Sequence, residues 1–281
     1  MTDDIYTHGH HSSVLKSHTW RRAENSAAYL LPHLGPSTEM LDVGCGPATI
    51  TCDFATRVSS VIGIEPVEGI LEKATATAAE RGVSNVSFEV GSVYELRFAD
   101  DTFDVVHAHQ VLQHLTDPVG AIAEMVRVTK PGGVVALRDA DYHAMTWHPQ
   151  PPELDRWMDI YQAVARRNDA EPDAARYLIE WALAAGVDRS AITASADSWL
   201  YATEDERTWW ADLWADRSVN SAFGEQARDY NITNAEEQAT IAEAWRQWAQ
   251  HESANFTVPN GELLIRVGQH PDTRAKDLSP V

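Results

Sequence analysis

The chain has 281 residues, and its 42 acidic and 22 basic side chains give a formal net charge of −20. Nucleic acids and anionic membranes bind proteins mainly through lysine and arginine, so this charge argues against both classes of partner. Hydrophobic residues make up 44% of the chain, which is enough for one large domain or for a domain with insertions.

The first expected element is a helix that closes an N-terminal segment, residues 1–36. Apolar side chains from Trp20 to Leu34 recur at helical spacing, and Gly35-Pro36 marks the end of the pattern. The tail before Trp20 is polar and rich in histidine.

A short apolar strand follows and runs into a glycine-rich turn, with the sequence Leu41-Asp42-Val43-Gly44-Cys45-Gly46-Pro47. Glycines let the backbone turn sharply and approach a ligand closely, because they carry no side chain. Pro47 is expected at the first position of the next helix, where its fixed φ is favourable.

A second buried strand is expected at residues 61–64, and Glu65 lies just past its end. A carboxylate at this place can accept hydrogen bonds from both hydroxyls of a ribose. The turn and Glu65 therefore predict a nucleoside at the carboxyl ends of parallel strands. A pyrophosphate-containing nicotinamide cofactor is the weaker candidate, because Thr49 replaces the third glycine and Asp42 would repel phosphate.

Strands and helices then alternate, which predicts a parallel sheet with helices on both faces. Further strands are expected at residues 86–93, 103–109 and 134–137, and helices at 66–82 and 117–129.

The amino-acid composition changes after Asp139, because nine of the ten tryptophans lie from Trp147 onward. Two strands are expected here, and four helical stretches: helices at residues 153–167, 174–185, 204–220 and 235–252, and strands at 192–201 and 263–267. Segments 145–170 and 203–255 are interpreted as insertions. Their aromatic side chains favour a pocket for an apolar or aromatic molecule, although core or dimer packing would explain them equally well.

The ordered motifs between residues 41 and 139 resemble those of class I S-adenosylmethionine-dependent methyltransferases, in the ubiquinone/menaquinone methyltransferase branch. The resemblance implies an α/β, Rossmann-like, seven-stranded methyltransferase sheet of order 3-2-1-4-5-7-6, with strand seven antiparallel and helices on both faces. A mostly helical cap would come from the insertions after strands five and six. The implied division is residues 1–36 over the cofactor, 37–144 as the S-adenosylmethionine-binding core, and 145–281 as insertions with the last two strands.

The resemblance also implies a set of cofactor-binding residues. Gly44 and Gly46 would pass under the methionine portion, Asp42 would orient the turn, and Glu65 would hold the ribose. The remaining candidates lie beside the ribose, around the adenine, at the end of strand four, and in the N-terminal segment: Pro66; Gly91, Ser92 and Val93; His109 and Gln110; and Tyr6, His10, His11 and Arg21. Arg21 would pair with the carboxylate of the methionine portion.

His114 is the candidate general base, since it follows strand four on the segment that faces the transferred methyl in the resembled enzymes. A packing histidine is the alternative. A cluster of four residues at the end of strand five could contact substrate: Asp139, Asp141, Tyr142 and His143. Histidines occur in pairs, such as His107 and His109, without a complete ligand set, so no metal is expected.

The expected function is methyl transfer from S-adenosylmethionine to an oxygen, nitrogen or carbon atom of a small, apolar or aromatic metabolite. The alternatives are a non-catalytic nucleoside-binding relative and a nicotinamide-dependent oxidoreductase. A homodimer is possible. The two cysteines, Cys45 and Cys52, form no structural disulfide framework, and the N-terminus does not resemble a signal peptide, so a cytoplasmic location is expected.

Overall fold

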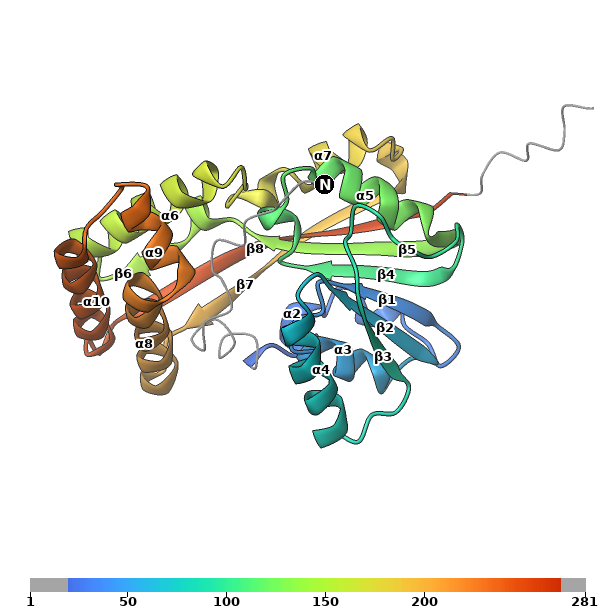
Figure 1. Cartoon of the computed structure of the whole chain (residues 1–281), viewed down its shortest axis with the longest axis horizontal. Coiled ribbons are helices and arrows are strands. Elements are labelled where there is room, and N and C mark those ends of the chain that lie inside the picture. The colour runs from blue at the N-terminus through green and yellow to red at the C-terminus, as the bar shows by residue number, and fades with distance from the viewer. Residues whose placement is uncertain (1–19, 269–281) are drawn as a thin grey trace, which may run out of the picture.

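The computed structural model describes residues 20–268, which form one mixed sheet, flanking helices and a helical cap (Figure 1). The sheet order is β3-β2-β1-β4-β5-β8, and β8 also pairs with β6 and β7. The strands are β1 (Glu39–Val43), β2 (Ser60–Glu65), β3 (Val86–Val90), β4 (Phe103–His109), β5 (Thr129–Ala140), β6 (Thr146–His148), β7 (Ile192–Tyr201) and β8 (Asn255–Arg266).

The strand order expected from the resemblance is confirmed. The first five strands are parallel, and β8 runs antiparallel to β5 on one side and to β7 on the other, so β8 and β7 take the places of strands seven and six. The three-residue β6 is an eighth strand, and it pairs with the start of β8.

Alternating side chains bury the two faces of the sheet against different helices. Met40, Val105 and Ala136 pack on one face with α2 (Ala23–Ser26) and α3 (Thr49–Ala55). Leu41 and Val106 point to the other face. That face packs against α5 (Pro118–Arg127) and α7 (Leu178–Ala184), while α4 (Glu68–Glu80) packs on α3. Figure 1 shows α2, α3 and α4 on one side of the sheet and α5 and α7 on the other.

Two local predictions in the first third of the chain are wrong. The expected helix from Trp20 to Leu34 is only α2 followed by a 3₁₀ turn, η1 (Leu31–His33). The backbone leaves the helical region at Ala27, with a φ of −147°, and Pro32 has no N–H with which to continue an α-helix further along. Pro47 is not the first residue of α3. Ala48 adopts a left-handed conformation with φ of 62°, which keeps Pro47 in the turn and starts the helix at Thr49.

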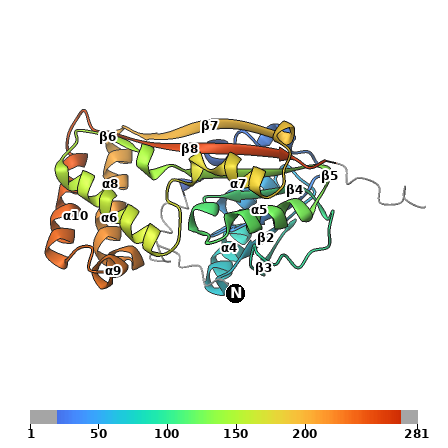
Figure 2. The ribbon, with the colours of Figure 1, turned by 90° about the horizontal axis from the view of Figure 1, so that it is seen from above.

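The cap lies beyond one end of β7 and β8 (Figure 2). Among the described residues it contains four helices. They are α6 (Pro152–Arg167), α8 (Glu204–Asn220), α9 (Ala222–Asp229) and α10 (Ala235–Ala249). Short 3₁₀ turns connect other elements: η2 (Leu112–His114), η3 (Tyr142–Ala144), η4 (Ala174–Arg176) and η5 (Arg189–Ala191).

Strand β8 begins at Asn255, eight residues before the expected start at Leu263. Pro259 and Gly261 interrupt the sequence pattern but are accommodated, since the Pro259 carbonyl accepts a hydrogen bond from the Asp141 N–H. The missing N–H of the proline faces the same side, where β5 has ended at Ala140 and β6 has not begun, so no ladder bond is lost.

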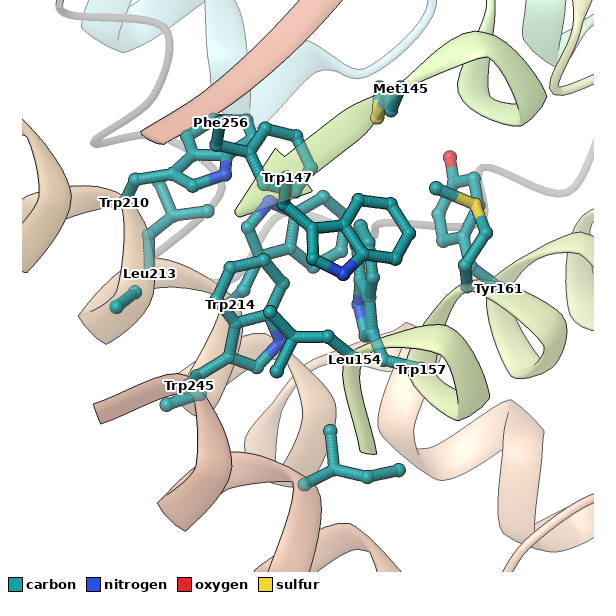
Figure 3. Packing of buried hydrophobic residues seen from close by; sticks show 14 of the residues in the cluster. Met145, Trp147, Leu154, Trp157, Tyr161, Trp210, Leu213, Trp214, Trp245 and Phe256 are labelled. Carbon is teal, nitrogen blue, oxygen red and sulfur yellow. The ribbon is translucent and has the colours of Figure 1, made fainter. Parts of the chain in front are cut away.

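The cap has its own hydrophobic core, in which tryptophans are the largest side chains (Figure 3). Trp157 is at the centre, with its ring centroid 4.5 Å from that of Trp214 and 5.0 Å from that of Trp245. Trp147 stacks on Phe256 at 5.5 Å, which ties β6 to β8. Most of these rings are therefore structural. Over residues 20–268, no helix combines the length and apolar character needed to cross a membrane.

Candidate active site

A cavity of about 660 Å³ opens at the carboxyl ends of the parallel strands and continues into the cap. Its first part, the sheet half, is lined by Gly44, Glu65, Ser92, Gln110 and their neighbours. Its second part, the cap half, is lined mainly by Tyr142, Met145, Tyr201, Trp210, Trp214 and Arg217. The volume lies within the usual range of small-molecule pockets, about 300–1,000 Å³.

The glycine turn sits against the loop after β4. Gly44 has a φ of +67°, and a Cβ added there would lie 2.5 Å from Cγ2 of Val111. The Gly44 and Cys45 N–H groups donate to the Ile64 carbonyl at 2.9 and 3.1 Å, so the turn is fixed to β2. Only glycine combines this backbone conformation with this close approach.

Glu65 is the last residue of β2, and it lines the sheet half beside Pro66. Its Oε2 atom accepts a hydrogen bond from the Gly46 N–H at 3.3 Å. Burial raises the pKa of Glu65 to about 7, although backbone N–H groups of Gly46 and Val67 pull it in the opposite direction. The carboxylate is therefore poised to become fully ionised when hydroxyl donors reach it.

Asp42 is buried below the turn with both oxygens engaged. Oδ2 accepts from the Thr51 hydroxyl at 2.6 Å, and Oδ1 lies 2.7 Å from Nδ1 of His107. These contacts join β1 to α3 and to β4, so Asp42 holds the turn in place from beneath.

The loop after β3 forms another wall of the sheet half, through Gly91, Ser92 and Val93. The Gly91 N–H donates to the Glu65 carbonyl at 3.2 Å, which keeps this loop next to the carboxylate. Val93 is 7% exposed and packs into the main core, whereas Ser92 is exposed.

The end of β4 meets the N-terminal segment. Gln110 has a φ of 54°, an uncommon conformation for a residue other than glycine. Its side-chain carbonyl accepts from Nη2 of Arg21 at 3.0 Å, and its amide donates to Oδ1 of Asn260 at 3.2 Å. The guanidinium carbon of Arg21 also lies 5.5 Å from the Trp199 ring centre, and His109 packs edge-on against Trp199. Arg21, His109 and Gln110 all line the cavity.

His114 lines the cavity from η2, and Asp139 lies behind that turn. Oδ1 of Asp139 accepts from the Gln113 N–H at 3.2 Å, and burial raises the pKa of Asp139 to about 7. Burial also lowers the pKa of His114 to about 3, and the positive charge of Arg21 adds to this effect. The imidazole of His114 is thus neutral and weakly basic.

Of the four polar residues expected after β5, only Tyr142 lines the cavity. Asp139 is fully buried behind η2. Asp141 pairs with Arg176 through two hydrogen bonds, of 2.8 and 2.5 Å, and the His143 N–H donates to Asp173. Asp139, Asp141 and His143 therefore do not line the cavity, and Tyr142 is the one of the four placed to contact substrate.

The sequence favoured an aromatic pocket in the insertions but did not single out several of the residues that shape the cap half. Trp210, Trp214 and Arg217 stand at positions i, i+4 and i+7 of α8, so they share one helix face, and all three line the cavity. Tyr201 stacks on Trp210 with ring centroids 4.3 Å apart. The i, i+4, i+7 spacing was the available signal, but α8 is buried on several sides and the spacing alone does not identify the cavity face.

Three expected cofactor residues, Tyr6, His10 and His11, lie outside the described part of the chain. Among residues 20–268, no group of three or more His, Cys, Asp or Glu side chains could hold a metal ion.

The strand order and glycine turn define a Rossmann-like α/β fold of the methyltransferase type. Residues 34–208, more than half of the chain, match the family described as "Methyltransferase domain", and the chain belongs to that family.

Known proteins agree with this assignment. An uncharacterized methyltransferase of Schizosaccharomyces pombe is 36% identical over 276 residues, covering 94% of this chain and 98% of that protein. A probable methyltransferase of Aspergillus luteorubrus is 31% identical over 280 residues, covering 92% of this chain and 96% of that protein. The crystal structure of the YcgJ protein of a Bacillus species superposes with a TM-score of 0.56 at 19% identity, covering 86% of this chain and 98% of that one, which shows a shared fold.

The protein is an S-adenosylmethionine-dependent methyltransferase, so the nicotinamide-dependent and non-catalytic alternatives are set aside. The described residues fit this methyl donor. The turn at Gly44 packs so closely against Val111 that a Cβ would not fit, and the Glu65 carboxylate lines the same cavity.

Proposed function

We propose that this enzyme methylates an oxygen, nitrogen or carbon atom of a small, apolar or aromatic metabolite. One observation carries the proposal: a single cavity joins a sheet half lined by Glu65 and the glycine turn to an aromatic cap half. Small-molecule pockets are mostly apolar with a few placed polar groups, as the cap half is. The net charge of −20 speaks against a nucleic-acid acceptor.

In this proposal the sheet half holds the donor. Glu65 accepts hydrogen bonds from the ribose hydroxyls with Pro66 beside it. The adenine lies along the loop formed by Gly91, Ser92 and Val93, where Ser92 offers a hydroxyl in place of a carboxylate.

The methionine portion lies over Gly44 and Gly46, and Asp42 acts through its buried contacts beneath the turn. The His109 carbonyl and Gln110 face the ammonium group. Arg21 pairs with the carboxylate, and its hydrogen bond to Gln110 supports this placement.

S-adenosylmethionine, when bound, supplies a methyl group on a positively charged sulfur that is already a good leaving group. The protein therefore has to align the acceptor and exclude water. Trp210, Trp214 and Tyr142 provide apolar walls that serve both purposes. His114 was the sequence-based choice for a general base, but an imidazole with a pKa of about 3 accepts protons poorly near neutral pH. We therefore assign His114 a positioning role.

Three finer expectations stay predictions: membership of the ubiquinone/menaquinone branch, a homodimeric state and a cytoplasmic location. The order of motifs along the chain supports the first. Cys45 and Cys52 are both free and buried, which agrees with a reducing compartment.

An acceptor screen tests the proposal. The full chain is incubated with S-adenosylmethionine and panels of phenols, carboxylic acids, amines and quinones, and product masses are recorded. We expect an apolar or aromatic compound to gain one methyl group, and excess S-adenosylhomocysteine to suppress the product. Binding of S-adenosylhomocysteine in calorimetry, without methyl transfer to any compound of this kind, would contradict the proposed acceptor class.

A further inference from the structure

The cap half of the cavity contains a tyrosine hydroxyl that is available to a ligand. Tyr201, the last residue of β7, is 1% exposed and lines the cavity. No group within residues 20–268 forms a hydrogen bond with its hydroxyl. The hydroxyl of Tyr142, the other tyrosine of the cap half, is hydrogen-bonded to Tyr161. Because buried polar groups nearly always have a partner, the Tyr201 hydroxyl is a place where a ligand can bind.

The ring of Tyr201 is held between tryptophans, which fixes the position of its hydroxyl. It stacks on Trp210, with ring centroids 4.3 Å apart and 15° between the ring planes. Trp20 and Trp209 also contact the ring, at centroid distances of 5.6 and 5.8 Å. Trp210 in turn packs against Phe256 in the cap core, 5.5 Å away (Figure 3). A hydrogen-bonding group that is held in this way cannot turn aside from a ligand that leaves it without a partner, so it discriminates between ligands.

The polar atoms of these two stacked rings are hydrogen-bond donors. Burial raises the pKa of Tyr201 above its ordinary value, although nearby arginines act in the opposite direction, so the phenol keeps its proton at physiological pH. The indole N–H of Trp210 is also buried, and it has no hydrogen-bond partner among the described residues. An indole N–H can only donate. This wall of the cavity therefore favours a ligand atom that accepts hydrogen bonds and has no proton of its own, as a carbonyl oxygen does.

We propose that the Tyr201 hydroxyl donates a hydrogen bond to a carbonyl oxygen of the substrate, so that the compound methylated is an aromatic or apolar molecule with a carbonyl group. Tyr201 lies in the cap half, and the proposed function assigns the methyl donor to the sheet half. The carbonyl oxygen is therefore separate from the atom that is methylated. A compound without this oxygen would bury the hydroxyl unpaired, which weakens its binding. This inference rests on the proposed function and narrows its substrate class.

Calorimetry on the full chain, saturated with S-adenosylhomocysteine, tests this inference without relying on turnover. Three ketones are titrated beside analogues of similar shape that lack the carbonyl oxygen: 4-hydroxyacetophenone with 4-isopropylphenol, 6-hydroxy-1-tetralone with 5,6,7,8-tetrahydro-2-naphthol, and 4-hydroxybenzophenone with 4-benzylphenol. At about pH 6.5 these phenols stay protonated, so charge does not enter the comparison. We expect at least one ketone to bind with a dissociation constant of about 1 mM or below.

Two variants complete the calorimetry. Tyr201→Phe removes the hydroxyl and keeps the stacked ring, so the affinity for the ketone relative to its carbonyl-free analogue should fall about tenfold, the effect of one buried hydrogen bond. The affinity for the analogue itself should stay the same or rise, which a collapsed pocket would not allow. Tyr230→Phe is the matched control, because the Tyr230 hydroxyl donates to Asn168 at 2.6 Å in the cap and lies outside the cavity lining. It should keep the wild-type preference.

Two further measurements keep the test valid if a variant does not fold. Affinity for S-adenosylhomocysteine and the circular dichroism spectrum report whether each variant is folded. Infrared spectroscopy of a ¹³C-carbonyl-labelled ketone bound to the wild type needs no variant. The carbonyl stretch of the bound ketone should lie below its frequency in hexane, because a hydrogen bond weakens the C=O bond.

The inference is overturned if folded Tyr201→Phe keeps the wild-type preference for the ketone, if the carbonyl stretch is not lowered, or if none of the three ketones binds at about 1 mM. Methylation of carbonyl-free compounds in the acceptor screen, as readily as of their carbonyl-bearing counterparts, would overturn this inference and leave the proposed function standing. Failure of the proposed function has a different signature, which is donor binding with no methyl transfer to any apolar or aromatic compound.

Discussion

Replacing Glu65 with glutamine should remove a pH dependence from donor binding. The pKa of Glu65 is raised to about 7 in the ligand-free protein, mainly by burial. Two ribose hydroxyls donating to the carboxylate stabilise its ionised form, so binding must release a proton wherever Glu65 is still protonated. Affinity for S-adenosylhomocysteine is therefore highest above pH 7 and falls as the pH is lowered.

The size of the effect follows from the ionised fraction. With a pKa of about 7, the carboxylate is about 90% ionised at pH 8 and about 3% ionised at pH 5.5, so the dissociation constant should rise about 30-fold between these values. The Glu65→Gln variant should show little change over this range. At pH 8 it should bind more weakly than the wild type by about 1.5–3 kcal/mol, or roughly 10- to 100-fold, because it loses hydrogen bonds to a charged group.

Isothermal titration calorimetry between pH 5.5 and 8, in two buffers of different ionisation enthalpy, measures both the affinity and the number of protons released. Glu89→Gln is the matched control, because Glu89 is an exposed carboxylate on neighbouring β3, outside the cavity lining. The ligand ionises identically in all three proteins, so their comparison isolates the side chain. A wild-type affinity that is constant over this range would refute the reasoning, as would a Glu65→Gln variant that keeps the wild-type slope.

Three further predictions concern the turn, the histidine and the buried acid. Gly44→Ala should lose the thermal stabilisation given by S-adenosylhomocysteine, since its Cβ would lie 2.5 Å from Val111. The control Gly69→Ala, in open space on α4, should keep this stabilisation and make the protein itself about 0.5–1 kcal/mol more stable. If Gly44→Ala is stabilised by the ligand like the wild type, the turn does not bind the donor. His114→Asn should lower kcat/KM less than tenfold on an identified acceptor, because a general base would contribute about 10²–10⁴-fold; a larger loss, with an inflection that disappears from the pH–rate profile, would restore the base role. Burial raises the pKa of Asp139 to about 7, so ionisation destabilises the fold progressively as pH rises from about 4 to about 7. Urea unfolding should therefore show Asp139→Asn losing about 2–4 kcal/mol less stability than the wild type between pH 5 and 8, and parallel losses would disprove this.

The cofactor-binding half of the cavity could be predicted from the sequence because it depends on local backbone conformation and on residue types at fixed spacing. A left-handed backbone at Gly44 and a carboxylate at the end of a buried strand both appear as residue types at fixed spacing. The resemblance then supplied the strand order, which no periodicity reveals. The departures at Pro32 and Pro47 have a common cause, since a proline's neighbours decide whether it starts, breaks or precedes a helix.

The cap could not be read in the same way. Strand β6 has three residues, too few to show alternation, and the start of β8 was hidden by Pro259 and Gly261. Helix α8 buries residues on several sides, so no single apolar face marks the cavity. The weak basicity of His114 depends on its burial by segments that are distant in the sequence. Residue type and spacing do not show this burial.

Strands β7 and β8 serve both the cap and the sheet. The ladder between them is unbroken from Ile192 opposite Ile265 to Tyr201 opposite Phe256, and the twelve residues of β8 span about 40 Å. The cap therefore has no hinge along these strands, and it cannot rotate as a separate lid without breaking main-chain hydrogen bonds. Cap and sheet should melt as one cooperative unit, and a truncation that removes the cap helices would expose the apolar ends of β7 and β8, where Tyr201 and Phe256 pack into the cap core.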